Sequence, residues 1–115
     1  MQYMLLIYHN EAGGMSPSDQ AAMLQEYIAF TQDIVQKGKF KAGDRLQPTT
    51  TATTVRVRNG KITTTDGPFA ETKEQLGGYY LVEANDLDEA ITIAGRIPGA
   101  KYGSIEVRPL WVMNR

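Results

Sequence analysis

Three carboxylates gather in one short segment of the chain. Asp66, Glu71 and Glu74 fall within nine residues of one another, beside Lys73. Two carboxylates held together in a desolvated cleft cannot both ionise easily, so the pKa of one rises into the range of a general acid or base. Lys73 could pair with an anionic substrate or tune a neighbouring carboxylate. Asp66 and Glu71 are therefore candidate catalytic residues, and Lys73 is a candidate substrate-binding residue.

A purely structural interpretation of the same segment competes with the chemical one. Asp66-Gly67-Pro68 is typical of a turn, in which an aspartate bonds its own backbone downstream. Lys73 could form solvated surface pairs with Glu71 or Glu74, and such pairs contribute little to stability. From the residue types alone, both interpretations stay open.

Three further side chains are candidates for substrate binding. Arg108 could anchor a carboxylate or phenolate, although a salt bridge with Glu106 across a dimer is the alternative. Tyr79 could present its phenol to a ligand or serve as an aromatic contact between two copies. His9 is the single histidine, and imidazole alone among side chains ordinarily titrates near neutrality. A solvated loop histidine is the simpler interpretation of that residue.

Composition excludes several classes of protein. With 12 basic and 13 acidic residues and a net charge of −1, the chain has no electrostatic excess for direct binding of nucleic acid or an anionic membrane. Cysteine is absent, and one histidine would leave a zinc site almost entirely to carboxylates. No apolar stretch approaches the roughly 20 residues of a membrane span, and no signal peptide opens the chain. We expect a single cytoplasmic domain over residues 1–115, with no metal and no cofactor.

Strand and helix patterns alternate along the chain. Apolar runs predict strands over 2–8, 40–46, 77–84 and 104–112, and helical spacing predicts helices that begin after Ser16 and after Asp86. Asn59-Gly60 lies between the β-branched runs 55–58 and 61–65 and predicts a type I′ hairpin, because both turn positions need a positive φ. The apolar stripe expected on the first helix consists of Met23, Leu24, Tyr27, Ile28, Phe30, Thr31, Ile34 and Val35.

This order of elements predicts an α+β domain of the ferredoxin-like, or split βαβ, kind with an inserted β-hairpin. Two helices can cover only one face of the sheet, whereas several strands look apolar on both faces. A second copy is the simplest cover for the open face. The pattern therefore predicts a homodimer with an enclosed space between two sheets.

The segment 66–74 reads DGPFAETKE, the strand that follows contains GGYY, and the last strand contains EVRP at 106–109. With the opening YMLLIY and the capped second helix, the chain resembles the YCII-related family, in its DGPF-domain branch, over nearly its whole length. The resemblance implies ferredoxin-like protomers that form a dimeric α+β barrel with a cavity between the sheets.

The resemblance implies no settled activity. YCII-related proteins include members suspected of enzyme action through a His–Asp pair, and a dehydrochlorinase of a chlorinated hydroxyhydroquinone. The histidine of these enzymatic relatives lies within the first helix, at a position that falls near Tyr27 here. That helix contains no histidine, so the His–Asp mechanism does not carry over. Members of the DGPF branch are often encoded beside extracytoplasmic-function sigma factors.

Two functions follow as expectations. The first is a small-molecule-binding protein, with a cofactor-independent lyase or isomerase of a small anionic or aromatic compound as its enzymatic form. The second is a non-enzymatic accessory or regulatory protein that has a sigma-factor-related partner. An enzyme needs the motif carboxylates to converge on an enclosed cavity, whereas a contact protein needs them exposed on a rim.

Overall fold

The computed structural model describes residues 1–112; residues 113–115 of the predicted domain lie outside the described part. In chain order the elements are β1 (Gln2–His9), α1 (Pro17–Gln36), β2 (Phe40–Arg45), the 3₁₀ turn η1 (Thr49–Thr51), β3 (Thr53–Arg58), β4 (Lys61–Asp66), β5 (Gln75–Glu83), α2 (Leu87–Gly95), the 3₁₀ turn η2 (Pro98–Lys101) and β6 (Ser104–Pro109). Two helices and antiparallel strands confirm the prediction of an α+β domain. No helix in the described residues is long and apolar enough to cross a membrane.

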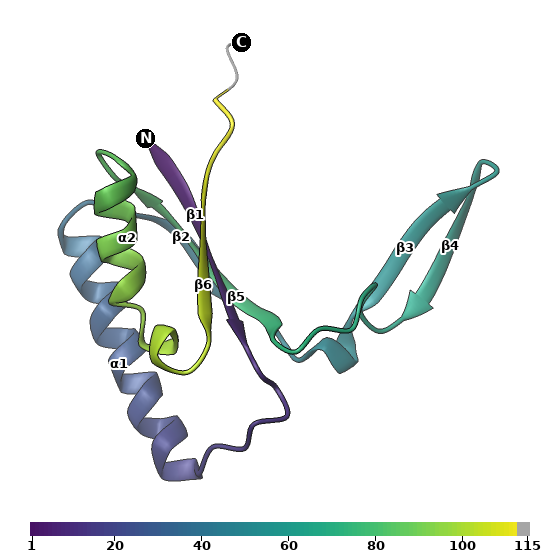
Figure 1. Cartoon of the computed structure of the whole chain (residues 1–115), viewed down its shortest axis with the longest axis horizontal. Coiled ribbons are helices and arrows are strands. Elements are labelled where there is room, and N and C mark those ends of the chain that lie inside the picture. The colour runs from purple at the N-terminus through teal and green to yellow at the C-terminus, as the bar shows by residue number, and fades with distance from the viewer. Residues whose placement is uncertain (113–115) are drawn as a thin grey trace.

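Four strands form one antiparallel sheet in the order β2-β5-β1-β6. This order places β5 between β1 and β2, and β1 between β5 and β6, so each βαβ unit is split by a strand of the other. Both helices lie on one side of the sheet (Figure 1). The other face has no covering layer within the described residues.

The hydrophobic core lies between this sheet and the helices. Along β1 the buried residues Tyr3, Leu5 and Ile7 alternate with half-buried ones, which is the period of two that a strand imposes. Tyr80 on β5 contacts the ring of Phe30 on α1 edge-on, with 5.2 Å between ring centroids. The remaining buried core residues are Ile34, Val82, Ala84, Ala90, Ile93, Ala94 and Ile97.

The buried side of α1 is narrower than the sequence pattern predicts. Phe30 and Ile34 are the buried residues of this helix. Three residues of the expected stripe, Leu24, Ile28 and Val35, are 54%, 43% and 52% exposed. The prediction was wrong for these three because the helix carries two adjacent apolar rows, and the sheet buries only the row that contains Phe30 and Ile34.

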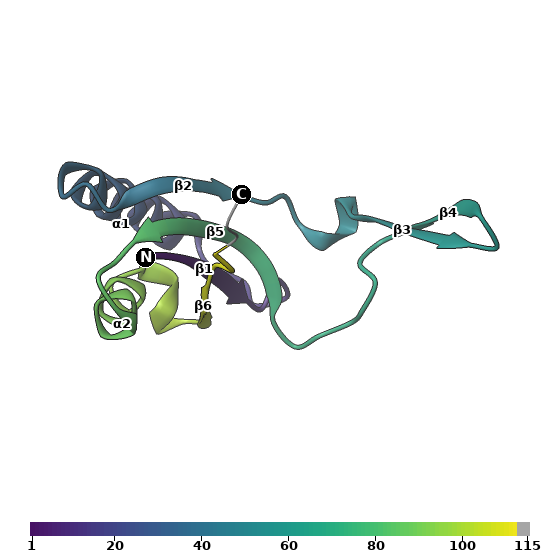
Figure 2. The same cartoon turned by 90° about the horizontal axis from the view of Figure 1, so that it is seen from above.

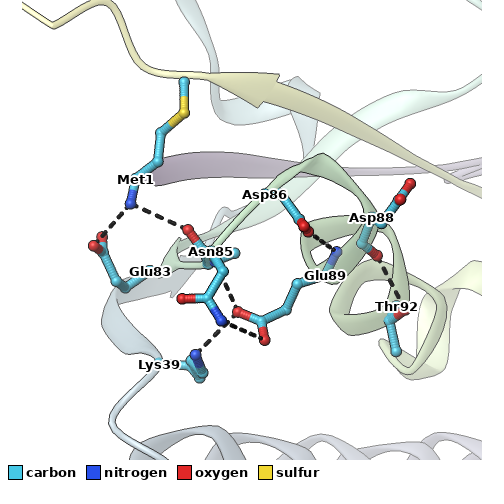
Figure 3. Close-up of polar contacts among 9 residues, drawn as sticks. Met1, Lys39, Glu83, Asn85, Asp86, Asp88, Glu89 and Thr92 are labelled. Carbon is cyan, nitrogen blue, oxygen red and sulfur yellow. Dashed lines mark hydrogen bonds and ion pairs between the residues drawn. The ribbon is translucent and has the colours of Figure 1, made fainter.

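The start of α2 is stabilised by a local capping network (Figure 3). The Asp86 side chain accepts a hydrogen bond of 2.9 Å from the Glu89 backbone, and the Glu89 carboxylate accepts one of 2.9 Å from the Asn85 backbone. Lys39, just before β2, donates to the same carboxylate at 2.9 Å. The Lys39 hydrogen bond, followed by that of Asn85, lowers the pKa of Glu89 below its ordinary value.

The last strand is shorter than the predicted segment 104–112. Pairing of β6 with β1 ends at Pro109, opposite Tyr3. One more backbone hydrogen bond of 3.0 Å follows, from Leu110 to Gln2. Trp111 lies beyond the strand and is 90% exposed.

β3 and β4 form a separate two-stranded antiparallel sheet, which we call the arm (residues 53–66). Its turn contains Asn59 at φ 53° and Gly60 at φ 74°, the positive values that this hairpin type requires. In both views the arm projects away from the four-stranded sheet on the side opposite the helices (Figures 1 and 2).

Candidate functional site

The face of the sheet that the helices leave uncovered is called the open face below. Strand alternation and register place these side chains on it: Met4, Leu6 and Tyr8 of β1, Tyr79 and Leu81 of β5, Ala42 and Asp44 of β2, and Glu106 and Arg108 of β6. The apolar side chains come mostly from the two central strands, and the charged ones from the two edge strands. An apolar floor with a few polar groups at its border is typical of a small-molecule site.

One row of side chains crosses the whole open face. The strand register aligns Glu106, Leu6, Tyr79 and Asp44 from one edge of the sheet to the other. Tyr79 donates a hydrogen bond of 2.8 Å from its hydroxyl to Asp44 Oδ2. That bond, together with the negative charge of Asp44, raises the pKa of the Tyr79 phenol.

A second phenol lies beside this row. Tyr8 donates from its hydroxyl to Glu106 Oε1 at 3.5 Å, which is long for a hydrogen bond between oxygens. The two tyrosines therefore interact with carboxylates at opposite edges of the sheet.

Arg108 occupies the next row, where it pairs in register with Met4 on β1. Its side chain is exposed, and no ion pair within residues 1–112 involves it. The guanidinium is therefore available to an anion on the open face. A salt bridge from Arg108 to Glu106 of a second copy stays a prediction.

The motif segment begins at Asp66, the last residue of β4, and its residues are not part of this row. Asp66, Glu71 and Lys73 are all exposed. Among the hydrogen bonds and ion pairs of residues 1–112, none connects these three side chains to the open face. Within one chain, their proposed acid–base and binding roles stay predictions.

The second half of the motif is held by hydrogen bonds. The Thr72 hydroxyl donates to the Glu74 carbonyl at 2.5 Å, and the Gln75 side chain donates to the Thr72 carbonyl at 2.6 Å. Ser104, at the start of β6, donates to Glu74 Oε1 at 2.7 Å. These contacts fix the path of the chain into β5. Both the carbonyl and the carboxylate of Glu74 are engaged in structural hydrogen bonds.

The first half of the motif borders an open hollow of about 400 Å³ at the base of the arm. Pro68 and Phe69 line it from the motif, and Leu46, Pro48 and Leu76 line it from neighbouring segments. Phe69 is nevertheless 81% exposed. The motif therefore presents an aromatic ring to solvent beside its acidic residues.

His9 lies at the end of β1, with its ring against the backbone of β5. A Cβ atom at Gly77 would come within 2.8 Å of His9 Cε1, so the ring occupies space that only glycine leaves free. The β1–β5 register shifts between Ile7 and Tyr8, at the same place. His9 is exposed, as expected for a residue at a strand end.

Glu11 is a polar anchor that the sequence patterns did not reveal. Its carboxylate accepts hydrogen bonds from the Thr49 hydroxyl at 2.5 Å and from the Thr49 backbone at 2.9 Å. These bonds lower the pKa of Glu11. The backbone of Glu11 also donates to Gln75 at 2.9 Å. The sequence contains three consecutive threonines at 49–51, but residue type alone does not indicate their partner.

The structure thus gathers Tyr79 and Arg108 on the open face, places His9 at a strand end, and leaves the motif side chains exposed. In residues 1–112, no three histidine, aspartate or glutamate side chains are grouped so that they could hold a metal ion. Within the described residues, the open face is therefore the surface on which candidate binding side chains lie together.

Known proteins resemble this chain in sequence and in fold. A family model described as the YCII-related domain matches residues 1–114. The uncharacterized protein R00369 of Rhizobium meliloti (strain 1021) is 40% identical over 114 residues, which are 96% of this chain and 92% of that protein.

Among solved structures, one is similar over nearly the whole chain. It is the 5-chloro-2-hydroxyhydroquinone dehydrochlorinase TftG from Burkholderia phenoliruptrix AC1100, in complex with 2,5-dihydroxybenzoquinone. The TM-score is 0.56 at 15% identity, and the match covers 96% of this chain and 94% of that one. At this identity the similarity shows a shared fold.

Proposed function

The chain belongs to the YCII-related domain family, and from that premise we propose that it binds a small, anionic ring compound on the open face of its sheet. The observation that carries this proposal is the row in which Tyr79 and Glu106 flank an apolar centre, with Arg108 beside it. A flat ring would lie on Leu6 and its apolar neighbours. Its oxygens would accept hydrogen bonds from Arg108, beside the phenols of Tyr79 and Tyr8, whose own hydroxyls donate to Asp44 and Glu106.

The fold neighbour supports the same class of ligand. That dehydrochlorinase is described with 2,5-dihydroxybenzoquinone, a planar ring whose hydroxyls ionise readily. Such a dianionic ring offers oxygens at opposite ends, which fits an arginine at one end and tyrosines along its sides. An enzymatic form of the function would be a cofactor-independent lyase or isomerase, with Asp66 and Glu71 as acid–base candidates.

A homodimer is part of the proposal. The open face is half-buried and apolar at its centre, and a second copy packed sheet to sheet, about 10 Å away, would enclose the ligand between two faces. Such an arrangement is the dimeric α+β barrel that the family resemblance implies. It would also bring Glu106 of one copy within reach of Arg108 of the other, if no anionic ligand occupies the site.

A second candidate function is favoured by the exposure of the motif. Phe69 is 81% exposed beside the exposed acids Asp66 and Glu71, which is the arrangement expected of a contact surface. The partner would be a sigma-factor-related protein, in line with the accessory function predicted from the sequence. Under this alternative, Phe69→Ala abolishes complex formation with that partner and leaves the binding of a small ring compound unchanged.

Titration calorimetry with 2,5-dihydroxybenzoquinone as the probe tests the first proposal. The wild-type chain should bind it, and Arg108→Gln should weaken binding about 10-fold or more, since a hydrogen bond to a charged group is worth about 1.5–3 kcal/mol. Arg58→Gln is the matched control, because Arg58 lies at the tip of the arm and its side chain, within residues 1–112, bonds only the carbonyl of Val57. If both variants bind the quinone with equal affinity, any binding occurs elsewhere, and the proposed site on the open face is contradicted.

A further inference from the structure

The hydroxyl of Tyr79 can act only as an acceptor toward a ligand. Its single proton is donated to Asp44 Oδ2 over 2.8 Å. An ionised carboxylate accepts hydrogen bonds and has none to donate, so the direction of this bond is fixed. Only the lone pairs of the phenol oxygen then remain free to contact a further group on the open face. A ligand atom that contacts this oxygen must therefore bring its own proton.

Turning the hydroxyl away from Asp44 is unfavourable. Within residues 1–112, the Asp44 carboxylate has no other hydrogen bond and no ion pair. A hydrogen bond to an ionised group is stronger than one between neutral groups. If Tyr79 donated to a ligand oxygen instead, the carboxylate would lose this bond and its negative charge would face that oxygen. Asp44 therefore holds Tyr79 in the accepting orientation.

The opposite edge of the sheet has the same polarity. Tyr8 donates to Glu106 Oε1 at 3.5 Å, in the same sense but over a longer and weaker bond. The carboxylates of Glu106 and Asp44 repel an anionic group of a ligand from both ends of the row. Arg108 lies one row further along β6, and no ion pair in the part of the chain that the structure describes neutralises it. The anionic group is thus directed to Arg108, and the proton donor to Tyr79.

The separation of these two side chains fits one aromatic ring. Arg108 and Tyr79 lie two strands and one row apart in the register. With strands about 4.8 Å apart and a rise of about 3.4 Å per residue, their Cα atoms are about 12 Å apart. Side chains that stand perpendicular to the sheet keep this separation, so hydrogen bonds of about 2.9 Å at both ends leave about 6 Å for the ligand. That length is the size of a six-membered ring with an oxygen-bearing group at each end.

We propose that the ligand of the open face carries an anionic group at one end of its ring and a protonated hydroxyl at the other, which donates to Tyr79. Asp44 is the positioning residue that sets this requirement, since it holds the Tyr79 proton and does not touch the ligand. The inference rests on the proposed function and narrows it. An anionic quinone satisfies Arg108, whereas a ring that keeps its hydroxyl proton satisfies Arg108 and Tyr79 together.

Titration calorimetry at neutral pH with two matched probes tests this requirement. 4-Hydroxybenzoate and 4-methoxybenzoate share a carboxylate opposite an oxygen, but only the first carries a proton on that oxygen. The wild-type chain should bind 4-hydroxybenzoate about 5-fold or more tightly than 4-methoxybenzoate, as expected for one hydrogen bond. Tyr79→Phe removes the acceptor and should abolish this preference. A preference that survives in Tyr79→Phe would come from the extra methyl group of 4-methoxybenzoate, and it would overturn the inference.

Asp44→Asn tests the positioning role. A carboxamide donates as well as accepts, so the Tyr79 hydroxyl can turn and donate to the ether oxygen of 4-methoxybenzoate. The ratio of the two affinities should fall to about 2-fold or less, whereas a merely structural role would weaken both probes and leave the ratio unchanged. Asp88→Asn is the matched control, because Asp88 lies on α2, on the other side of the sheet (Figure 1). It should keep the wild-type ratio.

The outcomes separate this inference from the function on which it rests. If Arg108→Gln weakens both probes and the wild-type chain binds them equally, the inference is overturned and the open-face site stands. If the quinone binds and neither benzoate does, the hydroxyl requirement is likewise overturned. If none of the three compounds binds, the proposed function fails together with the inference. An unchanged ratio in Asp44→Asn would contradict the positioning role of Asp44.

Discussion

Tyr79 on the central strand β5 and Asp44 on the edge strand β2 are joined by a hydrogen bond of 2.8 Å on the open face. The carboxylate stabilises the protonated phenol, because the hydroxyl donates to it and a phenolate would face its negative charge. The pKa of Tyr79 is therefore raised above the ordinary tyrosine value, first by this hydrogen bond and then by the charge.

The first prediction concerns this pair. Asp44→Asn removes the charge, so the pKa of Tyr79 should move down toward its ordinary value. An alkaline titration followed by ultraviolet absorbance measures it, with Tyr79→Phe used to identify which transition belongs to this residue. Asp66→Asn, which removes an exposed carboxylate elsewhere, is the control and should leave the Tyr79 transition in place. An unchanged transition in Asp44→Asn would mean that the hydrogen bond is not formed in solution.

A second prediction concerns acid stability. The pKa of Glu89 is lowered in the folded chain, so its contribution to stability is present above the ordinary carboxyl pKa and is lost as the pH falls through the folded value. Glu89→Gln should therefore lower the melting temperature at neutral pH and leave it less changed in acid. Thermal melts over a series of pH values test this. Asp88→Asn, at an exposed neighbour in the first turn, should show a smaller loss at neutral pH.

A third prediction uses two glycines. A Cβ atom at Gly103 would lie 2.0 Å from the carbonyl oxygen of Tyr8, whereas one at Gly95 would have no neighbour within 4 Å. Backbone cannot move aside as a flexible side chain can, so Gly103→Ala should cost more than about 3 kcal/mol of unfolding free energy. Gly95→Ala, at the end of α2, should be neutral or stabilise by up to about 1 kcal/mol. Urea denaturation compares the two.

The buried side of α1 provides a fourth prediction. Ile34 is 1% exposed and Ile28 is 43% exposed, although both belong to the stripe that the sequence predicts. Ile34→Ala should cost about 2–5 kcal/mol, the usual range for a core truncation, and Ile28→Ala less than about 1 kcal/mol. Equal losses in chemical denaturation would show that a further body covers Ile28, since within the chain only Ile34 is enclosed.

Features set by neighbouring residues could be predicted from the sequence. The Ser16 cap, which accepts a hydrogen bond of 3.1 Å from Asp19, and the Asp86 cap of α2 depend on side chains three residues apart. The turn at Asn59 and Gly60 likewise depends on two adjacent residues whose φ angles are positive. Such local rules hold because the interacting groups are brought together by the helix or turn itself.

Features that depend on distant residues could not be predicted. The contact of Glu11 with Thr49 joins segments 38 residues apart, and neither residue lies in a periodic pattern. Which apolar row of α1 is buried depends on how the helix crosses the sheet, and both rows have the same period. In the candidate site, Tyr79 and Arg108 were named from their residue types and their roles stay predictions, whereas Asp44 entered the site only through strand pairing.

The interior position of β1 in the sheet has a consequence for folding during synthesis of the chain. This first strand pairs with β5, which begins at Gln75, and with β6, which begins at Ser104. During synthesis on the ribosome, β1 emerges long before either neighbour exists, so its apolar residues have no ladder to join until β5 has left the exit tunnel. Pairings of such long sequence separation close slowly. The nascent chain should therefore be a substrate for holding chaperones until synthesis is nearly complete.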